Sequence, residues 1–351
     1  MILKERLQPN PIIVKELRSR MRGARAFIIL TIMLLALAGA LYGIYRLTML
    51  SARYQTIPGP YIGQSLFQSL LMLEMLVICM LTPALTAGAI SGEREKLTYE
   101  MLLTTPLSPT RILWGKLISA LSYILLLLVA AIPLASIVFI FGGVTPMQLV
   151  RSFLVLTVVA LLLGTVGIFM SAWLGRSGRA TVMSYLFVLL LFVSPIIALI
   201  AIGVSRQQIP PYELLMINPL SFLFSATLPA PSSSGVGMRV FNGLGFVIAG
   251  RFDVMEGDGN ILRPLYHYSL PLYLGLTLAF YMLAAQLVKP TRRWRIDLRS
   301  GLIAFVIVAL VAGSVVYGFY STKDQYGYWD AEEERFIPPV QPEIIEAVDL
   351  E

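Results

Sequence analysis

The 351-residue sequence has few charged residues, one cysteine and one histidine. Charged residues make up 13 % of the chain and hydrophobic residues 57 %, whereas ordinary globular domains have about 25 % charged residues. The single cysteine, Cys79, excludes an internal disulfide, and the single histidine, His267, leaves too few ligands for a Cys/His metal site. The chain also lacks the phosphate-binding motif G-x-x-x-x-G-K-[ST], so we expect no cofactor bound by this chain itself.

Long apolar runs indicate that the chain is an all-α polytopic membrane protein. A helix needs about 20 mainly apolar residues to cross the hydrocarbon core of a bilayer, and seven stretches approach that length. Four prolines within these stretches predict kinked or broken helices: Pro83, Pro133, Pro195 and Pro271. The predicted spans run approximately over residues 26–47, 66–90, 112–141, 153–174, 181–204, 268–288 and 302–320.

The distribution of Lys and Arg predicts the orientation of these spans. Alternate connections, beginning with the N-terminal segment, carry 18 of the 27 basic residues, and that side is expected to be cytoplasmic. The N-terminus is then cytoplasmic and the C-terminus extracytoplasmic, in a cell (plasma or inner) membrane. The net charge of +7 is thus read as topogenic, and no nucleic-acid partner is expected. The 25 residues before the first span favour an uncleaved helix over a signal peptide.

Four regions follow from this topology. Residues 1–25 are expected to form a cytoplasmic amphipathic interface helix, and residues 26–320 the transmembrane domain. The external connection 205–267 is rich in Pro, Gly and Ser and is expected to be mostly loop. Residues 321–351 carry nine acidic residues against two basic ones, which predicts a largely disordered extracytoplasmic tail.

The connection between the second and third spans has the pattern of a short amphipathic helix. Residues 93–103 contain no Gly or Pro, are rich in helix formers and have their acidic residues near the start. Pro106 ends this helix, and Ser108 with Pro109 starts the third span. Such a helix, held between two spans, can transmit a push from a cytosolic partner. The alternative is an interfacial helix that rests on lipid headgroups.

This connection resembles the coupling-helix region of type-2 ABC transporter permeases. The N-terminal Asn10-Pro11, followed by Lys15, Glu16 and Arg18, is similar to the interface helix that precedes the first span in that family. The resemblance covers approximately residues 8–176, and the remainder resembles the family only in topology. The matching residues of the connection are Ile90-Ser91-Gly92-Glu93-Arg94-Glu95, Thr98, Glu100, Leu102-Leu103, Thr105-Pro106-Leu107-Ser108, Ile112-Leu113 and Gly115-Lys116.

The resemblance implies the membrane subunit of an ABC exporter, with ATP and Mg bound and hydrolysed on a separate ABC ATPase subunit. A second permease subunit, identical or different, would complete the transporter. The family core has six spans, so the seventh span and the acidic tail are additions. The coupling helix is expected at about residues 93–105. Its residues expected to contact the ATPase are Glu93, Arg94, Glu95, Thr98, Tyr99, Glu100, Leu102, Leu103, Thr105 and Pro106.

Glu74 is the acidic residue that lies clearly within a predicted span. Its carboxyl should face the interior of the helix bundle, either on a substrate path or as a packing group. An alternative function is an ion-coupled secondary transporter or channel, but that machinery usually has several charged residues near mid-membrane. A membrane enzyme that uses the external connection is a third possibility, with few acidic residues there to support catalysis.

Overall fold

The computed structural model describes residues 24–52, 59–103, 109–206, 212–227, 266–288, 328–330 and 335–337. Within these ranges, six helices are long and apolar enough to cross a membrane. They coincide with the first six predicted spans, which confirms a helical, multi-pass membrane protein. The seventh predicted span and the interface helix lie outside the described residues. The six helices are α3 (Ala24–Ala52), α4 (Gly59–Thr86), α7 (Pro109–Phe141), α8 (Pro146–Leu174), α9 (Ser177–Arg206) and α12 (Tyr266–Leu287).

Helix α8 shows how local sequence sets the ends of a span. Thr145 accepts a hydrogen bond from the backbone N–H of Gln148, and the Gln148 side chain accepts one from the backbone N–H of Thr145. This capping box satisfies two of the amide groups that a helix leaves free at its start. At the other end Gly175 has φ 68°, a left-handed conformation that glycine adopts without the steric cost of a Cβ.

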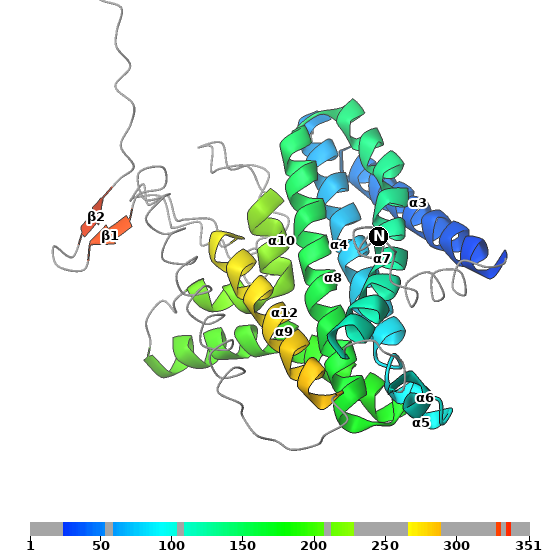
Figure 1. Cartoon of the computed structure of the whole chain (residues 1–351). Coiled ribbons are helices and arrows are strands. Elements are labelled where there is room, and N and C mark those ends of the chain that lie inside the picture. Colours follow the sequence, from blue (N-terminus) through cyan, green and yellow to red (C-terminus); the bar gives the residue numbers. More distant parts are fainter. Residues whose placement is uncertain are drawn as a thin grey trace, which may run out of the picture.

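The same helix is the centre of the bundle. Figure 1 shows α8 running between α4 and α12, and α10 (Pro219–Thr227) also packs on it. In its most apolar stretch 67 % of the residues are buried, compared with 11 % for α3. A Cβ on Gly167 would clash with Thr86 Oγ1 and would lie 2.9 Å from Thr86 Cβ. Glycine at this position therefore permits the close approach of α8 and α4.

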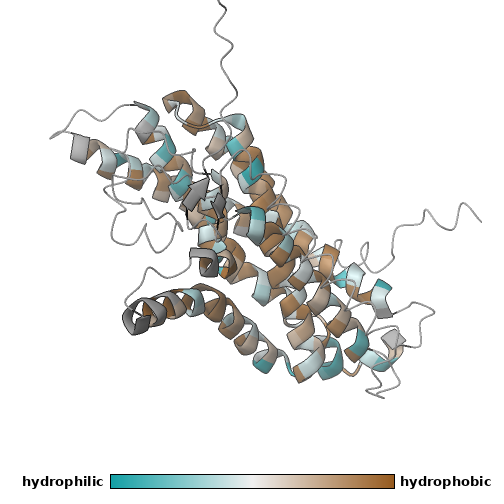
Figure 2. Ribbon diagram, turned by 90° about the vertical axis from the view of Figure 1, so that its left-hand side faces the viewer, coloured by the Kyte–Doolittle hydropathy of each residue, from teal (hydrophilic) through white to brown (hydrophobic). Residues whose placement is uncertain are grey.

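Apolar side chains cover the outside of the bundle as well as its core. Figure 2 shows that hydrophobic residues dominate the long helices. Large apolar side chains such as Leu35, Val129 and Leu190 are more than half exposed within the protein. A soluble protein rarely exposes so extended an apolar surface, whereas a bilayer covers it.

The structure adds detail to three predictions. Part of the external connection is helical: Tyr212–Ile217 forms a 3-10 helix, and α10 buries Phe222 and Leu223 against the bundle. Each of the four helices with an internal proline continues through it, so of the two predicted forms, kinked or broken, the broken one does not occur. Part of the tail predicted to be disordered forms an antiparallel hairpin of β1 (Tyr328–Asp330) and β2 (Arg335–Ile337).

Long-range hydrogen bonds hold the helical part of the external connection against the bundle. The Asn218 side chain donates to the Phe192 carbonyl oxygen at 3.0 Å, and the Tyr273 hydroxyl donates to the Ile217 carbonyl oxygen at 2.6 Å. Long-range partners of this kind satisfy backbone groups that local sequence leaves free. Turn-rich composition alone does not reveal them.

Candidate functional site

The connection between α4 and α7 is described over residues 87–103, and we call this segment the coupling segment. It contains two short helices, α5 (Ser91–Glu95) and α6 (Tyr99–Leu103), at one end of the bundle (Figure 1). The prediction of one continuous helix over residues 93–103 is therefore wrong. The break falls at Leu97, whose φ of 59° lies in the left-handed region.

A hydrogen-bonded cap causes this break. The backbone N–H of Thr98 donates to the Glu93 carbonyl oxygen at 3.0 Å, and the N–H of Leu97 donates to the Arg94 carbonyl oxygen at 3.1 Å. Together with the left-handed residue, this pair of bonds is a Schellman motif, the cap that commonly ends a helix at glycine. Leucine in that position carries a steric cost, so the surrounding contacts must hold it there.

Helix α8 holds the start of the coupling segment. The Ser171 hydroxyl oxygen accepts hydrogen bonds from the backbone N–H groups of Ile90 and Ser91, both at 2.9 Å. The Ser91 hydroxyl donates to the Ala87 carbonyl oxygen at 2.9 Å. All of these groups are buried, so the entry to α5 has fully partnered amides at the point where α4 ends.

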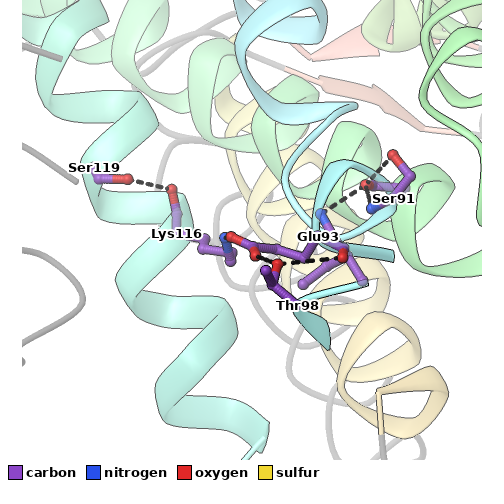
Figure 3. A network of polar contacts seen from close by, with 7 residues as sticks. Ser91, Glu93, Thr98, Lys116 and Ser119 are labelled. Carbon is purple, nitrogen blue, oxygen red and sulfur yellow. Dashed lines mark hydrogen bonds and ion pairs between the residues drawn. The ribbon is translucent and has the colours of Figure 1, made fainter. Parts of the chain in front are cut away.

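Helix α7 holds the middle of the segment through an ion pair. Lys116 Nζ lies 3.1 Å from Glu93 Oε1, and the side chains are 5 % and 31 % exposed, respectively. The Thr98 hydroxyl donates to the other carboxylate oxygen of Glu93. Figure 3 shows this network, in which the Ser119 hydroxyl also donates to the Lys116 carbonyl oxygen at 2.9 Å. Glu93 thus links the two halves of the coupling segment to the start of α7.

Helix α9 is held by Glu95. Its two carboxylate oxygens accept hydrogen bonds, both at 2.8 Å, from the backbone N–H and the hydroxyl of Ser177, the first residue of α9. A carboxylate at a helix start caps free amides and interacts favourably with the helix dipole. The apolar stretch Ile62–Glu95 has 34 residues, more than the about 20 that a bilayer requires, and the exposed Glu95 is its last residue, where the chain leaves the span. The hydrogen bonds from Ser177, with a smaller contribution from Arg176, hold the pKa of Glu95 below its ordinary value.

Helix α12 is held by Tyr99. The Tyr99 hydroxyl donates to the carbonyl oxygen of Val288, the residue after α12, at 3.2 Å. The Arg94 guanidinium carbon lies 4.8 Å from the centre of the Tyr99 ring, a cation–π contact. Arg94 also lies against Gly175, since a Cβ there would come within 3.3 Å of Nη1. The coupling segment therefore contacts the N-terminal parts of α7 and α9 and the C-terminal parts of α8 and α12, which meet at one end of the bundle.

The opposite face of the coupling segment is exposed in the described part of the chain. Leu97 is 85 % exposed and Met101 71 % exposed, with the exposed residues Lys96 and Glu100 beside them in sequence. Two exposed apolar side chains among charged neighbours form a small protruding surface, of the kind found where proteins bind one another.

The structure places five of the predicted coupling residues in this network: Glu93, Arg94, Glu95, Thr98 and Tyr99. Glu100 is exposed. The backbone of Leu102 and Leu103 belongs to α6, but their side chains lie outside the described part, as do Thr105 and Pro106 and the interface residues Lys15, Glu16 and Arg18.

Sequence reasoning missed the two serines that hold the segment, Ser171 and Ser177. Ser177 had a detectable signal, because a serine after Gly175 at the start of a predicted span is a candidate helix cap. Ser171 had none, since single serines are common within apolar helices. The structure also adds Lys116, which belonged to the matching motif without a role of its own.

Glu74 lies apart from this network, within α4. The residue is 3 % exposed, and neither carboxylate oxygen has a hydrogen-bond partner among the described residues. It lines a pocket formed by α3, α4 and α7 together with Met33, Leu37, Ile124 and Leu128, among other apolar residues. The prediction that its carboxyl faces the bundle interior is confirmed.

Comparison with known proteins agrees with this architecture. A family model described as ABC-2 family transporter protein matches residues 10–288, which include all six long helices and the coupling segment. A search of curated proteins finds no significant match.

Proposed function

Because this chain belongs to the ABC-2 family of transporter proteins, we propose that it is the membrane-spanning subunit of an exporter driven by a separate ATPase subunit. Membership makes the chain a component of membrane transport, and permeases of this family typically work with an ATPase subunit. ATP and Mg would bind to that partner. The proposal adds that the coupling segment is the docking site and that transport is outward.

One observation carries the proposal: the coupling segment is bound to four long helices on one face and exposes Leu97 and Met101 on the other. Burying an exposed Leu or Met side chain in a partner is worth about 1.5–3 kcal/mol. The ion pair of Glu93 with Lys116 and the cap of Glu95 on Ser177 are short connections to the helices. A displacement of the segment by a docked ATPase would therefore move the ends of α7, α8, α9 and α12 together.

In this mechanism the segment lies in the cytoplasm, with the N-terminus. A second permease subunit, identical or different, would face this one, and movement of the two bundles would open an outward path between them. The interface helix with Lys15, Glu16 and Arg18 would lie on the inner leaflet, where basic residues interact with lipid phosphates.

Co-purification of the full chain in a mild non-ionic detergent tests the docking site. The tagged wild-type protein should retain an ATPase subunit, and the double variant Leu97→Glu with Met101→Glu should lose it, since two charges would be buried without partners. Met147→Glu is the matched control because Met147 is 58 % exposed at the opposite end of α8. No ATPase with the wild type, or the same amount with the double variant, would contradict the proposal.

Cysteine accessibility tests the orientation. In a Cys79→Ala background, Leu97→Cys should resist a membrane-impermeant thiol reagent in intact cells and react after the membrane is opened. Met147→Cys should react in intact cells, because it lies at the other end of the bundle. Labelling in the reverse order would place the coupling segment outside and exclude a cytosolic ATPase as its partner.

A further inference from the structure

Helix α4 has a weak point at Pro83, shortly before the coupling segment. Pro83 has no backbone N–H and its ring displaces the preceding turn, so the helical hydrogen bonds of that turn are lost or weakened. Helices bend most sharply at such positions. The Met80 carbonyl oxygen, in that turn, accepts a hydrogen bond at 2.6 Å from the Tyr185 hydroxyl of α9. Neighbouring helices commonly supply a donor of this kind to a span that contains a proline.

The same arrangement occurs at Pro195 in α9. The Asn218 side chain donates to the Phe192 carbonyl oxygen at 3.0 Å, again three residues before the proline. Asn218 is 1 % exposed, so this bond ties the proline of α9 to a buried part of the structure. The repetition indicates that the Tyr185 bond serves the proline of α4 and is not an incidental contact.

Helix α9 joins the coupling segment to the part of α4 that precedes Pro83. At its start, Ser177 is bound to Glu95 through two hydrogen bonds of 2.8 Å. Eight residues later, about 12 Å along α9, Tyr185 is bound to Met80. The two anchors of α9 therefore lie on opposite sides of Pro83 in the chain.

Helix α8 faces α4 with glycines on both sides of Pro83. Gly164 lies against Thr82, and Gly167 lies against Thr86. Because these glycines have no side chains to interlock with α4, they permit the small sliding movements by which packed helices shift. The bond from Tyr185, in contrast, is directional, and a bend at Pro83 that carries the start of α9 along would break it.

We propose that Pro83 is the hinge about which the coupling segment swings, and that the Tyr185 hydroxyl is the latch that holds the segment in the position of the described structure. A docked ATPase that displaces the segment also displaces the start of α9, and this movement separates Tyr185 from Met80. Tyr185 is thus a positioning residue. Its role in transport rests on the proposed function, whereas the hinge and the latch are properties of this chain alone.

Spin-label distances in the full chain, in phosphatidylcholine nanodiscs without the ATPase, test the latch. In the Cys79→Ala background, Leu76→Cys and Leu97→Cys place labels on either side of Pro83 at positions that are more than half exposed. Double electron–electron resonance then reports the bend of α4, and this parent should give one narrow distance distribution. Tyr185→Phe, which removes the hydroxyl and keeps the ring, should raise the population of bent forms about two- to tenfold, the effect of one hydrogen bond on an equilibrium. An unchanged distribution would overturn the proposal.

Two further variants assign the effect to the hinge. Pro83→Ala restores the backbone N–H, so Tyr185→Phe in that background should leave the distribution as it is in Pro83→Ala alone. An equal increase there would refute the hinge. Tyr42→Phe is the matched control because it removes a hydroxyl from the exposed face of α3, and an equal effect from it would refute the latch. Failure of an ATPase to co-purify would contradict the proposed function without changing these distances, so the two proposals fail separately.

Discussion

Leu97 offers the sharpest test of the coupling segment. A glycine at this position should relieve the strain of the backbone, but it also removes the side chain that we expect to contact the ATPase. The left-handed conformation at φ 59° costs a leucine about 1–2 kcal/mol, and glycine avoids that cost. Glycine loses about 0.5–1 kcal/mol through the greater freedom of the unfolded chain. The side chain is 85 % exposed, so its removal forfeits little packing within this protein. Leu97→Gly should therefore leave the free energy of unfolding unchanged or raise it by up to about 1.5 kcal/mol.

The same substitution should weaken ATPase binding. If Leu97 becomes buried in the partner, its loss removes about 1.5–3 kcal/mol of binding free energy, a reduction in affinity of about 10- to 150-fold. Thermal unfolding in nanodiscs measures the first effect, and titration with the purified ATPase subunit measures the second. Leu97→Ala is the matched control, since it removes the side chain but keeps the backbone cost. Alanine should lose affinity without a gain in stability.

Either of two results would refute this reasoning. A glycine variant less stable than the wild type by more than about 1 kcal/mol would mean that the Leu97 side chain packs within the chain. Unchanged affinity in both variants would mean that Leu97 does not contact the ATPase. A stable glycine variant with weakened binding would separate the structural role of the residue from its docking role.

Three further predictions concern the contacts that hold the helices. Glu93→Gln removes the carboxylate that pairs with the buried Lys116 ammonium, whereas Lys116→Met replaces the ammonium with an apolar group, so the former should be less stable by about 1–3 kcal/mol. The opposite order in thermal unfolding would show that the pair is not buried in the membrane-embedded protein. Gly167→Ala should cost about 1–3 kcal/mol by forcing α8 from α4, whereas Gly39→Ala, with nothing within 4 Å of the added Cβ, should not. Equal unfolding midpoints for these two alanine variants would disprove the close contact. The pKa of Glu95 is lowered from 4.5, so its cap stabilises the protein above pH 4.5 and is lost as the pH falls through the folded-state value. The difference in unfolding midpoint between wild type and Glu95→Gln should shrink on acidification, and a constant difference would count against the cap.

The spans and their alternation were predictable because both depend on composition over long windows. The apolar length of each span is set by the thickness of the bilayer, and the positions of Lys and Arg predict which connections share a side. The structure places three of the connections predicted to share a side at one end of the bundle. Glu95, in the connection between α4 and α7, contacts Ser177 at the start of α9, and Tyr99 contacts Val288 after α12. By contrast, α10 was missed because its short apolar run lies within a turn-rich region, and long-range packing stabilises it.

The amino-acid sequence alone determined that this chain crosses a membrane several times and that Glu74 is buried in an apolar helix. It also singled out the connection between the second and third spans as the candidate site. Only the tertiary structure decided how that connection is folded and which helices it contacts. Helix propensity favoured one helix over residues 93–103, but the Schellman cap at Leu97 divides it, with contacts to α7, α8, α9 and α12 on either side of the break. Propensity is a weak local preference, and partners from distant helices, such as Lys116 and Ser177, override it.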